Sequence, residues 1–226
     1  MYFYRMLSLV EENYIKAVLH LASRDRAMTQ QEGVGTNDLA AYLLVKPSTV
    51  NEMLKRLKEK ELINHKKYGK ITLTPAGTTI GLSIVRKHRL WETFLCTKLD
   101  FEWDEVHDIA EQLEHIKSDK LIDKIDKFLG FPKFDPHGDP IPDHKGNLPK
   151  RNTQKLSLIP TGTTCVVLAV SDTDNVFLQY LEALHIAIGT TILISEKIAY
   201  DGTVKVLING NLTLLSKKVA DNILVD

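Results

Sequence analysis

The first part of the chain carries apolar residues at helical spacing, separated by short polar segments. Ser8 and Glu11 form the pattern of a capping box, in which two side chains bond each other's backbone amides at the start of a helix. Apolar residues then recur every three to four positions, which predicts a helix over about residues 8–23. The polar, glycine-bearing segment 28–35 is predicted to be the loop that ends it.

Two further apolar stripes with a short break between them predict a helix-turn-helix. Thr36 or Asn37 is positioned to cap the first helix, and Pro47 occupies a tolerated place in the first turn of the second. The second helix has one apolar face, whereas its N-terminus and outer faces carry residue types suited to base edges and phosphates. These predicted DNA contacts are Lys46, Ser48, Thr49, Asn51 and Lys55.

A basic hairpin is predicted directly after this helix. Residues 62–67 and 70–74 are strand-like, and Tyr68-Gly69 between them is a tight-turn signal. A basic hairpin behind a recognition helix is typical of the wing of a winged helix-turn-helix. Its predicted DNA contacts are Lys66, Lys67 and Lys70.

The middle of the chain is predicted to be helical, and the end to be a separate β unit. A long helix begins at Thr74-Pro75, and shorter helices follow over about residues 104–116 and 119–129. Residues 130–151 contain five of the eight prolines, which marks a linker. The β runs 163–170, 191–194 and 204–208, with a hairpin turn at Asn209-Gly210 and a helix over 175–184, then predict a small β-barrel with one helix.

Charge is balanced over the whole chain but unevenly distributed. The formal net charge is zero, yet residues 46–89 hold eleven Lys or Arg against three acids, and residues 100–126 hold ten acids against three Lys. This order indicates an anionic partner for the first block and a cationic one for the second. The chain has no apolar run of 18 residues and no signal-peptide pattern, so we expect a cytoplasmic protein that does not enter a membrane. Cys96 and Cys165 form no metal or disulfide spacing, and Cys165 is predicted to lie in a core.

Four potential metal ligands share one face of the predicted helix 104–116. His107, Glu111, Glu114 and His115 follow at i, i+4, i+7 and i+8, and the pair His88 and Glu92 stands at i, i+4 on the preceding helix. A solvated acidic face is the ordinary interpretation of such charges, but four aligned ligand types favour a cation site. Imidazole and carboxylate without thiolate suit divalent metals from Mn(II) to Zn(II), and the carboxylates favour Mn(II) or Fe(II).

Several motifs follow one another in a fixed order along the chain. They are Glu12-Asn13-Tyr14-Ile15, Pro47-Ser48-Thr49-Val50, Leu73-Thr74-Pro75-Ala76-Gly77, Arg86-Lys87-His88-Arg89-Leu90, Val106-His107-Asp108, Leu113-Glu114-His115 and Pro136-His137-Gly138-Asp139-Pro140-Ile141-Pro142. Together they resemble the diphtheria-toxin-repressor and manganese-transport-regulator family of metal-dependent transcriptional regulators. The resemblance implies an α+β protein: a winged helix-turn-helix over 1–76, a helical metal-binding and dimerisation domain with its linker over 77–151, and an SH3-like, FeoA-like β domain over 152–226.

The resemblance also implies a primary metal site formed by Glu111, Glu114 and His115, with a ligand from the first helix at the position of Asn13. Family members usually place Asp or Met there, so Asn13 is a departure. Its amide oxygen can ligate but is neutral, and a backbone carbonyl, a water or Glu12 could take its place.

An ancillary site is implied as well, and its ligands would be His88, Glu92, His107, Asp135 and His137. Asp172 or Asp174 could reach it from the β domain, although a plain loop role is favoured for them. Glu111 stands where manganese-responsive members have Glu and iron-responsive members have Cys, which favours Mn(II) over Fe(II). Lys16 occupies the position at which one manganese-responsive type supplies a further Glu, so the paired-metal arrangement of that type is not carried over.

The function predicted from the sequence is a homodimeric repressor of metal homeostasis that binds operator DNA when Mn(II) or Fe(II) is bound. Pairing of the helices over about 77–129 is expected because Trp91, Phe94 and Leu95 would need a partner surface. The main alternative is a metal-independent winged-helix DNA-binding regulator, favoured by Asn13 and Lys16. An enzyme, such as a metal hydrolase, is not predicted, because neither an HExxH motif nor a nucleophile elbow is present.

Overall fold

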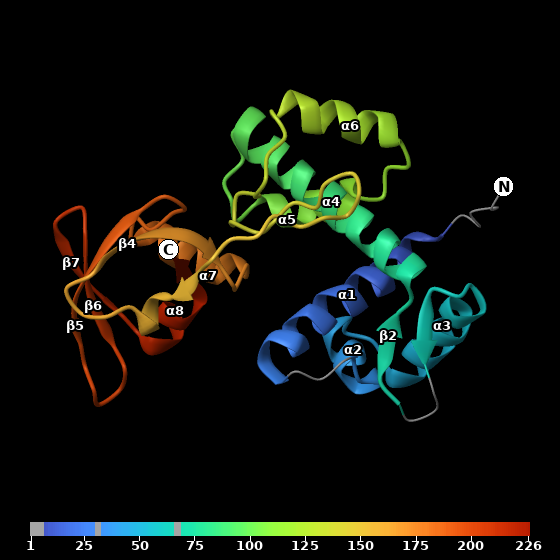
Figure 1. Ribbon diagram of the computed structural model, residues 1–226, viewed down its shortest axis with the longest axis horizontal. Helices are drawn as coiled ribbons and strands as arrows, with labels where there is room; N and C mark the ends of the chain where they lie inside the picture. The colour runs from blue at the N-terminus through green and yellow to red at the C-terminus, as the bar shows by residue number, and fades with distance from the viewer. Residues whose placement is uncertain (1–6, 30–32, 66–68) are drawn as a thin grey trace. The chain divides into compact units, whose positions relative to one another are not determined.

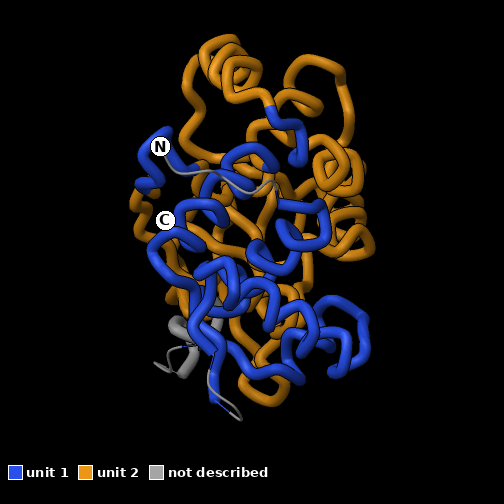
Figure 2. Tube along the Cα trace, turned by 90° about the vertical axis from the view of Figure 1, so that its right-hand side faces the viewer, with its two compact units in different colours: residues 1–88, 114–117, 142–147 blue, residues 89–113, 118–141, 148–226 orange. Residues whose placement is uncertain are grey.

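The computed structural model describes residues 7–29, 33–65 and 69–226. The chain forms two compact units, each assembled from separate stretches of sequence (Figure 2). The first unit comprises residues 1–88, 114–117 and 142–147, and the second comprises 89–113, 118–141 and 148–226. Within the described residues, no helix is long and apolar enough to cross a membrane.

The first unit is a helical domain with a two-stranded hairpin (Figure 1). Its elements are α1 Leu9–Thr29, α2 Thr36–Tyr42, α3 Pro47–Glu59, β1 Ile63–His65, β2 Ile71–Leu73 and the first part of α4 Pro75–Lys98. The strands β1 and β2 pair antiparallel, with Ile63 opposite Leu73. A single buried cluster, which includes Ile15, Leu39 and Leu54, joins α1, α2 and α3. The predicted helix-turn-helix and hairpin are therefore present.

The start of α1 is formed as predicted, but its end and the start of α2 are not. The capping box is confirmed, since Ser8 N donates to Glu11 Oε2 at 2.8 Å and Glu11 N donates to Ser8 Oγ at 3.2 Å. Helix α1 continues to Thr29, six residues beyond the predicted end, because no glycine or proline interrupts residues 23–29. The N-cap of α2 is Gly35 and makes no side-chain cap bond, so the prediction that Thr36 or Asn37 caps this helix was wrong.

The second unit contains the remaining part of α4, α5 Val106–Leu113 and α6 Asp119–Phe128. Helix α5 is shorter than predicted at both ends, and Glu114 and His115 lie in the turn that follows it. Trp91 and Leu95 are buried within the single chain, at 8% and 3% exposure. The expectation that they need a partner surface was therefore wrong, because side chains of the same chain already cover them.

The proline-rich segment 130–151 has no helix or strand, as predicted, but part of it is an ordered element of the second unit. Asp135 N donates to Asp139 O at 3.0 Å, and Ile141 N donates to Lys133 O at 2.8 Å. Asp135, His137 and Ile141 are buried. Folded turns, which satisfy backbone groups without a ladder, hold this segment in place.

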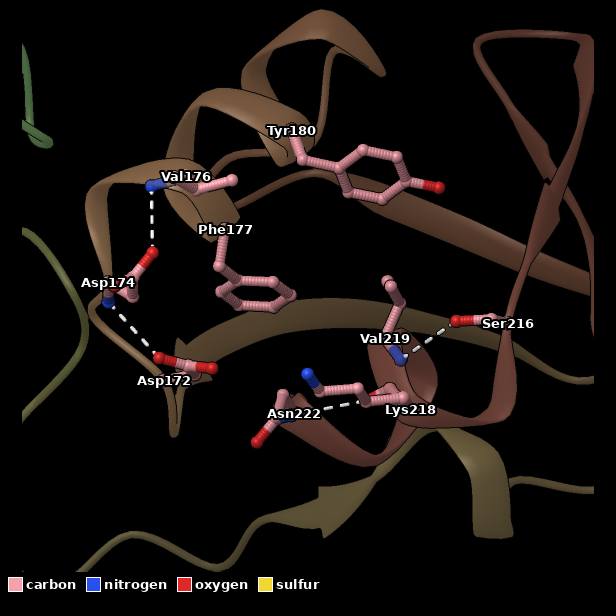
Figure 3. A pocket seen from close by; sticks show the side chains of 9 residues that line it. All are labelled: Asp172, Asp174, Val176, Phe177, Tyr180, Ser216, Lys218, Val219 and Asn222. Carbon is pink, nitrogen blue, oxygen red and sulfur yellow. Dashed lines mark hydrogen bonds between the residues drawn. The ribbon is translucent and has the colours of Figure 1, made fainter.

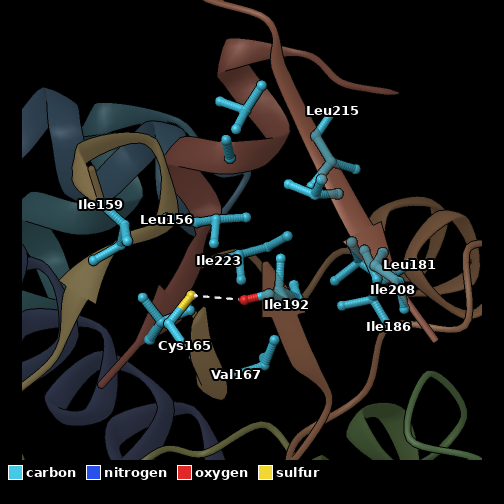
Figure 4. Packing of buried hydrophobic residues seen from close by; sticks show 14 of the residues in the cluster. Leu156, Ile159, Cys165, Val167, Leu181, Ile186, Ile192, Ile208, Leu215 and Ile223 are labelled. Atoms are coloured by element: carbon cyan, nitrogen blue, oxygen red, sulfur yellow. Dashed lines mark hydrogen bonds between the residues drawn. The ribbon is translucent and has the colours of Figure 1, made fainter. Parts of the chain in front are cut away.

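The C-terminal part of the second unit is a six-stranded antiparallel sheet with two short α-helices and a 3-10 helix, Leu156–Leu158. Its elements are β3 Gln154–Lys155, β4 Thr164–Val170, α7 Asn175–Ala183, β5 Thr191–Lys197, β6 Val204–Ile208, β7 Asn211–Leu215, α8 Lys217–Asn222 and β8 Ile223–Val225. The strand order is β3-β8-β4-β5-β6-β7. Apolar side chains of the sheet and helices form one core, in which Cys165 Sγ lies 3.6 Å from Ile192 O (Figure 4). The α+β class and the core position of Cys165 are confirmed.

Candidate metal centres and DNA interface

Helix α3 of the first unit presents one buried and one exposed face. Val50, Leu54 and Leu57 are buried, as the apolar stripe predicted. The predicted contact residues all lie on exposed positions, with Lys46 at the N-cap: Lys46, Ser48, Thr49, Asn51 and Lys55. Lys70 is exposed just before β2, whereas Lys66 and Lys67 lie outside the described residues. The exposed face carries hydrogen-bonding and cationic groups, which are the groups that read base edges and bind phosphates.

Titratable side chains gather in two groups. We call the first group the primary cluster, and Glu114 lies at its centre. Its members all belong to the first unit: Glu12, Lys16, His88, Glu114 and His115. The Glu114 side chain has no exposed surface. Its Oε2 lies 2.6 Å from Lys16 Nζ and 2.6 Å from His88 Nδ1. Lys16 Nζ also lies 3.1 Å from His88 Nδ1. One carboxylate oxygen is thus shared by a lysine of α1 and a histidine of α4.

The other oxygen of Glu114 is differently placed. Glu114 Oε1 is buried without a hydrogen-bond partner and lies 3.9 Å from His115 Nε2. Asn13, beside Glu12 in α1, likewise has a buried Oδ1 without a hydrogen-bond partner. A buried carboxylate or amide oxygen left unpaired costs free energy, and a bound cation offsets that cost for each oxygen that it contacts. The donor set of carboxylate, imidazole and amide oxygen suits a divalent metal such as Mn(II) or Fe(II).

Glu12 fixes the orientation of the His115 ring. Its Oε2 lies 2.6 Å from His115 Nδ1, and both side chains are about nine-tenths buried, at 9% and 10% exposure. An imidazole that donates Nδ1–H to a carboxylate keeps the lone pair of Nε2 for a metal. Glu12 therefore acts as a positioning residue in this structure, a role that the sequence pattern did not indicate.

The ancillary cluster lies in the second unit and consists of Glu92, His107, Glu111, Asp135 and His137. Glu92 occupies its middle: its Oε1 lies 3.4 Å from His107 Nδ1, and its Oε2 lies 3.9 Å from His137 Nδ1. Glu111 Oε1 lies 3.7 Å from the other nitrogen of His107, Nε2. Glu92, Asp135 and His137 each offer an atom within 4.8 Å of the others.

Backbone groups hold the two C-terminal members of the ancillary cluster. His137 Nε2 donates to the carbonyl oxygen of Trp103 at 2.8 Å, which leaves the lone pair of the neutral ring on Nδ1, the atom that faces Glu92. Asp135 Oδ1 accepts from the amides of His137 and Asp139, each at 2.9 Å. Burial raises the pKa of Asp135 well above its usual range, and the negative charges of Glu92 and Asp139 raise it further. The guanidinium of Arg89, whose Nε lies 3.5 Å from Asp135 Oδ2, lowers this pKa and already supplies one positive charge to the carboxyl group.

The prediction that four ligands share one helical face was wrong. His107 and Glu111 lie on α5, whereas Glu114 and His115 lie beyond its last residue, Leu113. The two pairs also belong to different units. The side chains of Glu114 and His115 bond to Lys16 and Glu12 of α1, so tertiary contacts take them away from the helical pattern.

The β domain carries a pocket between α7 and α8, and its lining residues belong to neither cluster (Figure 3). Asp174 Oδ1 accepts from Val176 N and caps α7, and Asp172 Oδ1 accepts from Asp174 N at 3.1 Å. Both aspartates therefore serve the local loop, the role favoured for them from the sequence.

Comparisons with known proteins agree with this architecture. The family model described as the iron-dependent repressor N-terminal DNA-binding domain matches residues 6–71. The family model described as the iron-dependent repressor metal-binding and dimerisation domain matches residues 74–143. The FeoA domain matches residues 154–226.

Similar proteins include regulators that respond to either metal. The chain is 29% identical over 135 residues, 57% of its length and 59% of the relative's, to the iron-dependent repressor IdeR of Mycobacterium tuberculosis. It is 32% identical over 105 residues, 46% of its length and 72% of the relative's, to the HTH-type transcriptional regulator MntR of Listeria welshimeri. A solved manganese-dependent transcriptional repressor in complex with manganese superposes with a TM-score of 0.82 at 36% identity, covering 95% of this chain and 98% of that one.

The chain therefore belongs to the iron-dependent repressor family of metal-dependent transcriptional regulators. The family resemblance and the fold inferred from the sequence motifs are confirmed. The chain spans less than two thirds of the length of the first curated relatives that it matches.

Proposed function

We propose that the protein is a homodimeric transcriptional repressor of metal homeostasis, which binds operator DNA in the cytoplasm when Mn(II) or Fe(II) is bound. The observation that carries the proposal is the buried Glu114 Oε1, which has no hydrogen-bond partner and lies 3.9 Å from Nε2 of the oriented His115 ring. A second buried oxygen without a partner, Asn13 Oδ1, lies on α1. These candidate ligands lie on α1 and just after α5. A metal ion bound by them would restrain α1, and so would change the conformation of the domain that carries α3.

The primary site would be held by Glu114, His115 and Asn13, with Glu111 as the further ligand that the family pattern supplies. A bound divalent ion would supply a double positive charge that neutralises the carboxylates. Glu12 orients His115 through its Nδ1. Because α1 packs against α2, α3 and β2, fixing Asn13 and Glu12 would fix the helix on which the DNA-binding elements rest.

The ancillary site would use Glu92, Asp135 and His137, with His107 on α5 and with His88, which lies one turn before Glu92 on α4. The support lies in the burial of Glu92, Asp135 and His137 and in the Trp103 carbonyl that directs His137 Nδ1 toward Glu92. The mixture of imidazole and carboxylate in both clusters favours Mn(II) or Fe(II) over softer ions.

The DNA contacts would come from α3 and the wing. Ser48, Thr49 and Asn51 would face base edges, and Lys46, Lys55 and Lys70 would bind phosphates, together with Lys66 and Lys67 of the wing. Two-fold pairing would come from the helical part of the second unit, where four large apolar side chains are exposed. They are Leu99, Leu121, Phe128 and Phe131.

Operator binding measured at fixed metal concentrations tests the proposal. We expect Mn(II) or Fe(II) to raise the affinity for an operator fragment by roughly thirtyfold, which corresponds to about 2 kcal/mol of coupling, and chelator to reverse it. Glu114→Ala and His115→Ala should lose this response, whereas Asp108→Asn, an exposed carboxylate of α5, should keep it. Sedimentation should show a dimer at micromolar concentration with metal present.

A metal-independent DNA-binding regulator is the rival function, favoured by the ion pair of Lys16 with Glu114. That rival requires operator affinity equal in chelator and in Mn(II), with Glu114→Ala as active as the unchanged protein. A folded Glu114→Ala protein that binds operator with an undiminished response to Mn(II) would overturn the proposed sensing site.

A further inference from the structure

Lys16 provides a positive charge inside the primary cluster. It lies on α1, and its side chain is 16% exposed while that of Glu114 is fully buried. Its Nζ donates to Glu114 Oε2 at 2.6 Å and lies 3.1 Å from His88 Nδ1. A charge-assisted bond of this length, made to a carboxylate without solvent access, is among the strong ones in proteins.

The two oxygens of Glu114 have different partners. Oε2 contacts both Lys16 and His88, whereas Oε1 has no hydrogen-bond partner and faces His115 Nε2. A cation that approaches from the His115 side therefore meets an available oxygen. A cation that needs Oε2 would first have to displace an ammonium group that the backbone of α1 holds in place.

We propose that Lys16 is a tethered cation that limits the primary cluster to one divalent ion and raises the metal concentration at which that ion binds. The proposal rests on the function proposed above and concerns the same site. Lys16 is a positioning and specificity-determining residue here, because it acts through Glu114.

The physical reason is repulsion between the fixed charge and the incoming one. An ammonium on Oε2 and an ion on Oε1 of one carboxylate would stand only about 5 Å apart, since both contacts are short. At such a separation the repulsion between a single and a double positive charge exceeds the thermal energy even when water screens it. The same ammonium compensates the buried carboxylate while no metal is bound, so it stabilises the metal-free protein.

Manganese titration of Lys16 variants tests this role directly. Glu92→Gln with Asp135→Asn would serve as the background, because these changes remove the ancillary cluster. In that background, Lys16→Met removes the charge and keeps much of the side-chain length, and Lys16→Arg keeps the charge. Lys60→Met is the matched control, because Lys60 Nζ lies 2.6 Å from Glu11 Oε1 in the same unit, in an ion pair that touches no proposed ligand.

We expect one Mn(II) per chain in the lysine-bearing protein by calorimetry, with an electron paramagnetic resonance spectrum of an isolated ion. Lys16→Met should bind Mn(II) at least about tenfold more tightly. It should also melt at a lower temperature without metal and gain more in melting temperature on adding Mn(II). Lys16→Arg and Lys60→Met should bind Mn(II) within about threefold of the parent.

Two results would overturn the role of Lys16: unchanged or weaker binding by Lys16→Met, or a coupled pair of ions in the lysine-bearing protein. If Lys16→Met does not fold, as judged by circular dichroism, Lys16→Gln takes its place in the same titration with the same expected gain. Failure of both the lysine-bearing and the charge-free proteins to take up Mn(II) would instead reject the proposed primary site, and this inference with it.

Discussion

Replacement of Glu12 by glutamine should weaken metal binding although Glu12 is not among the proposed ligands. Glu12 Oε2 lies 2.6 Å from His115 Nδ1, and both side chains are largely shielded from water. Glutamine preserves the shape but removes the negative charge that holds the Nδ1–H tautomer. The amide can also turn its NH₂ group toward the ring and favour the wrong tautomer, with the proton on Nε2.

The expected size of the effect follows from the kind of bond that is lost. A short hydrogen bond to a charged group contributes about 1.5–3 kcal/mol. Loss of a partner that orients a metal-ligating histidine typically costs about 10- to 100-fold in metal affinity, which is about 1.4–2.7 kcal/mol. The two estimates agree, so Glu12→Gln should raise the Kd for Mn(II) by one to two orders of magnitude.

Glu11→Gln is the matched control for this change. Glu11 is the adjacent residue, and its side chain is equally buried, at 8% exposure against 9% for that of Glu12, but it bonds to Ser8 and Lys60 instead of a ligand. It should destabilise the protein by about 1 kcal/mol through the helix cap and leave the Kd for Mn(II) within about twofold. Calorimetric titration of both variants, each first shown to be folded, measures the difference. Equal Kd values for Glu12→Gln and the unchanged protein would refute the orienting role of Glu12.

Three other predictions concern the scaffold and the DNA interface. Gly138→Ala should destabilise the second unit by at least about 2 kcal/mol more than Gly130→Ala in chemical denaturation. Both glycines have positive φ, but a Cβ on Gly138 would stand 2.2 Å from Leu168 O, whereas a Cβ on Gly130 would meet nothing within 4 Å. An equal loss of unfolding free energy in the two variants would contradict this reasoning. Lys55→Ala should reduce the slope of log affinity for operator against log salt concentration by about one unit, whereas Asn51→Ala should change the base preference. An unchanged slope would show that Lys55 makes no phosphate contact. Burial raises the pKa of Cys165 to about 11, so at pH 8 only about 0.1% should be thiolate and alkylation should require unfolding; rapid alkylation of Cys165 in the folded protein would contradict this assignment.

The DNA-binding elements could be predicted well from the sequence because their signals are local. The apolar stripe of Val50, Leu54 and Leu57 fixes which face of α3 is buried, and so which residues are exposed. The capping box of Ser8 and Glu11 forms between residues three positions apart. Helix ends were predicted less well: α1 extends to Thr29, since no glycine or proline stops it.

The sequence by itself determined the ligand types of the candidate metal centres, because carboxylates and imidazoles at family positions can be identified without coordinates. Only the tertiary structure decided how they are grouped. Glu114 and His115 leave the helical pattern after Leu113, since contacts with residues of α1 about a hundred positions earlier hold them. Helical periodicity describes neighbours three and four residues apart and carries no information on such contacts. For the same reason, the orientation of His115 by Glu12 and the placement of the Lys16 charge on Glu114 could be known only from the folded chain.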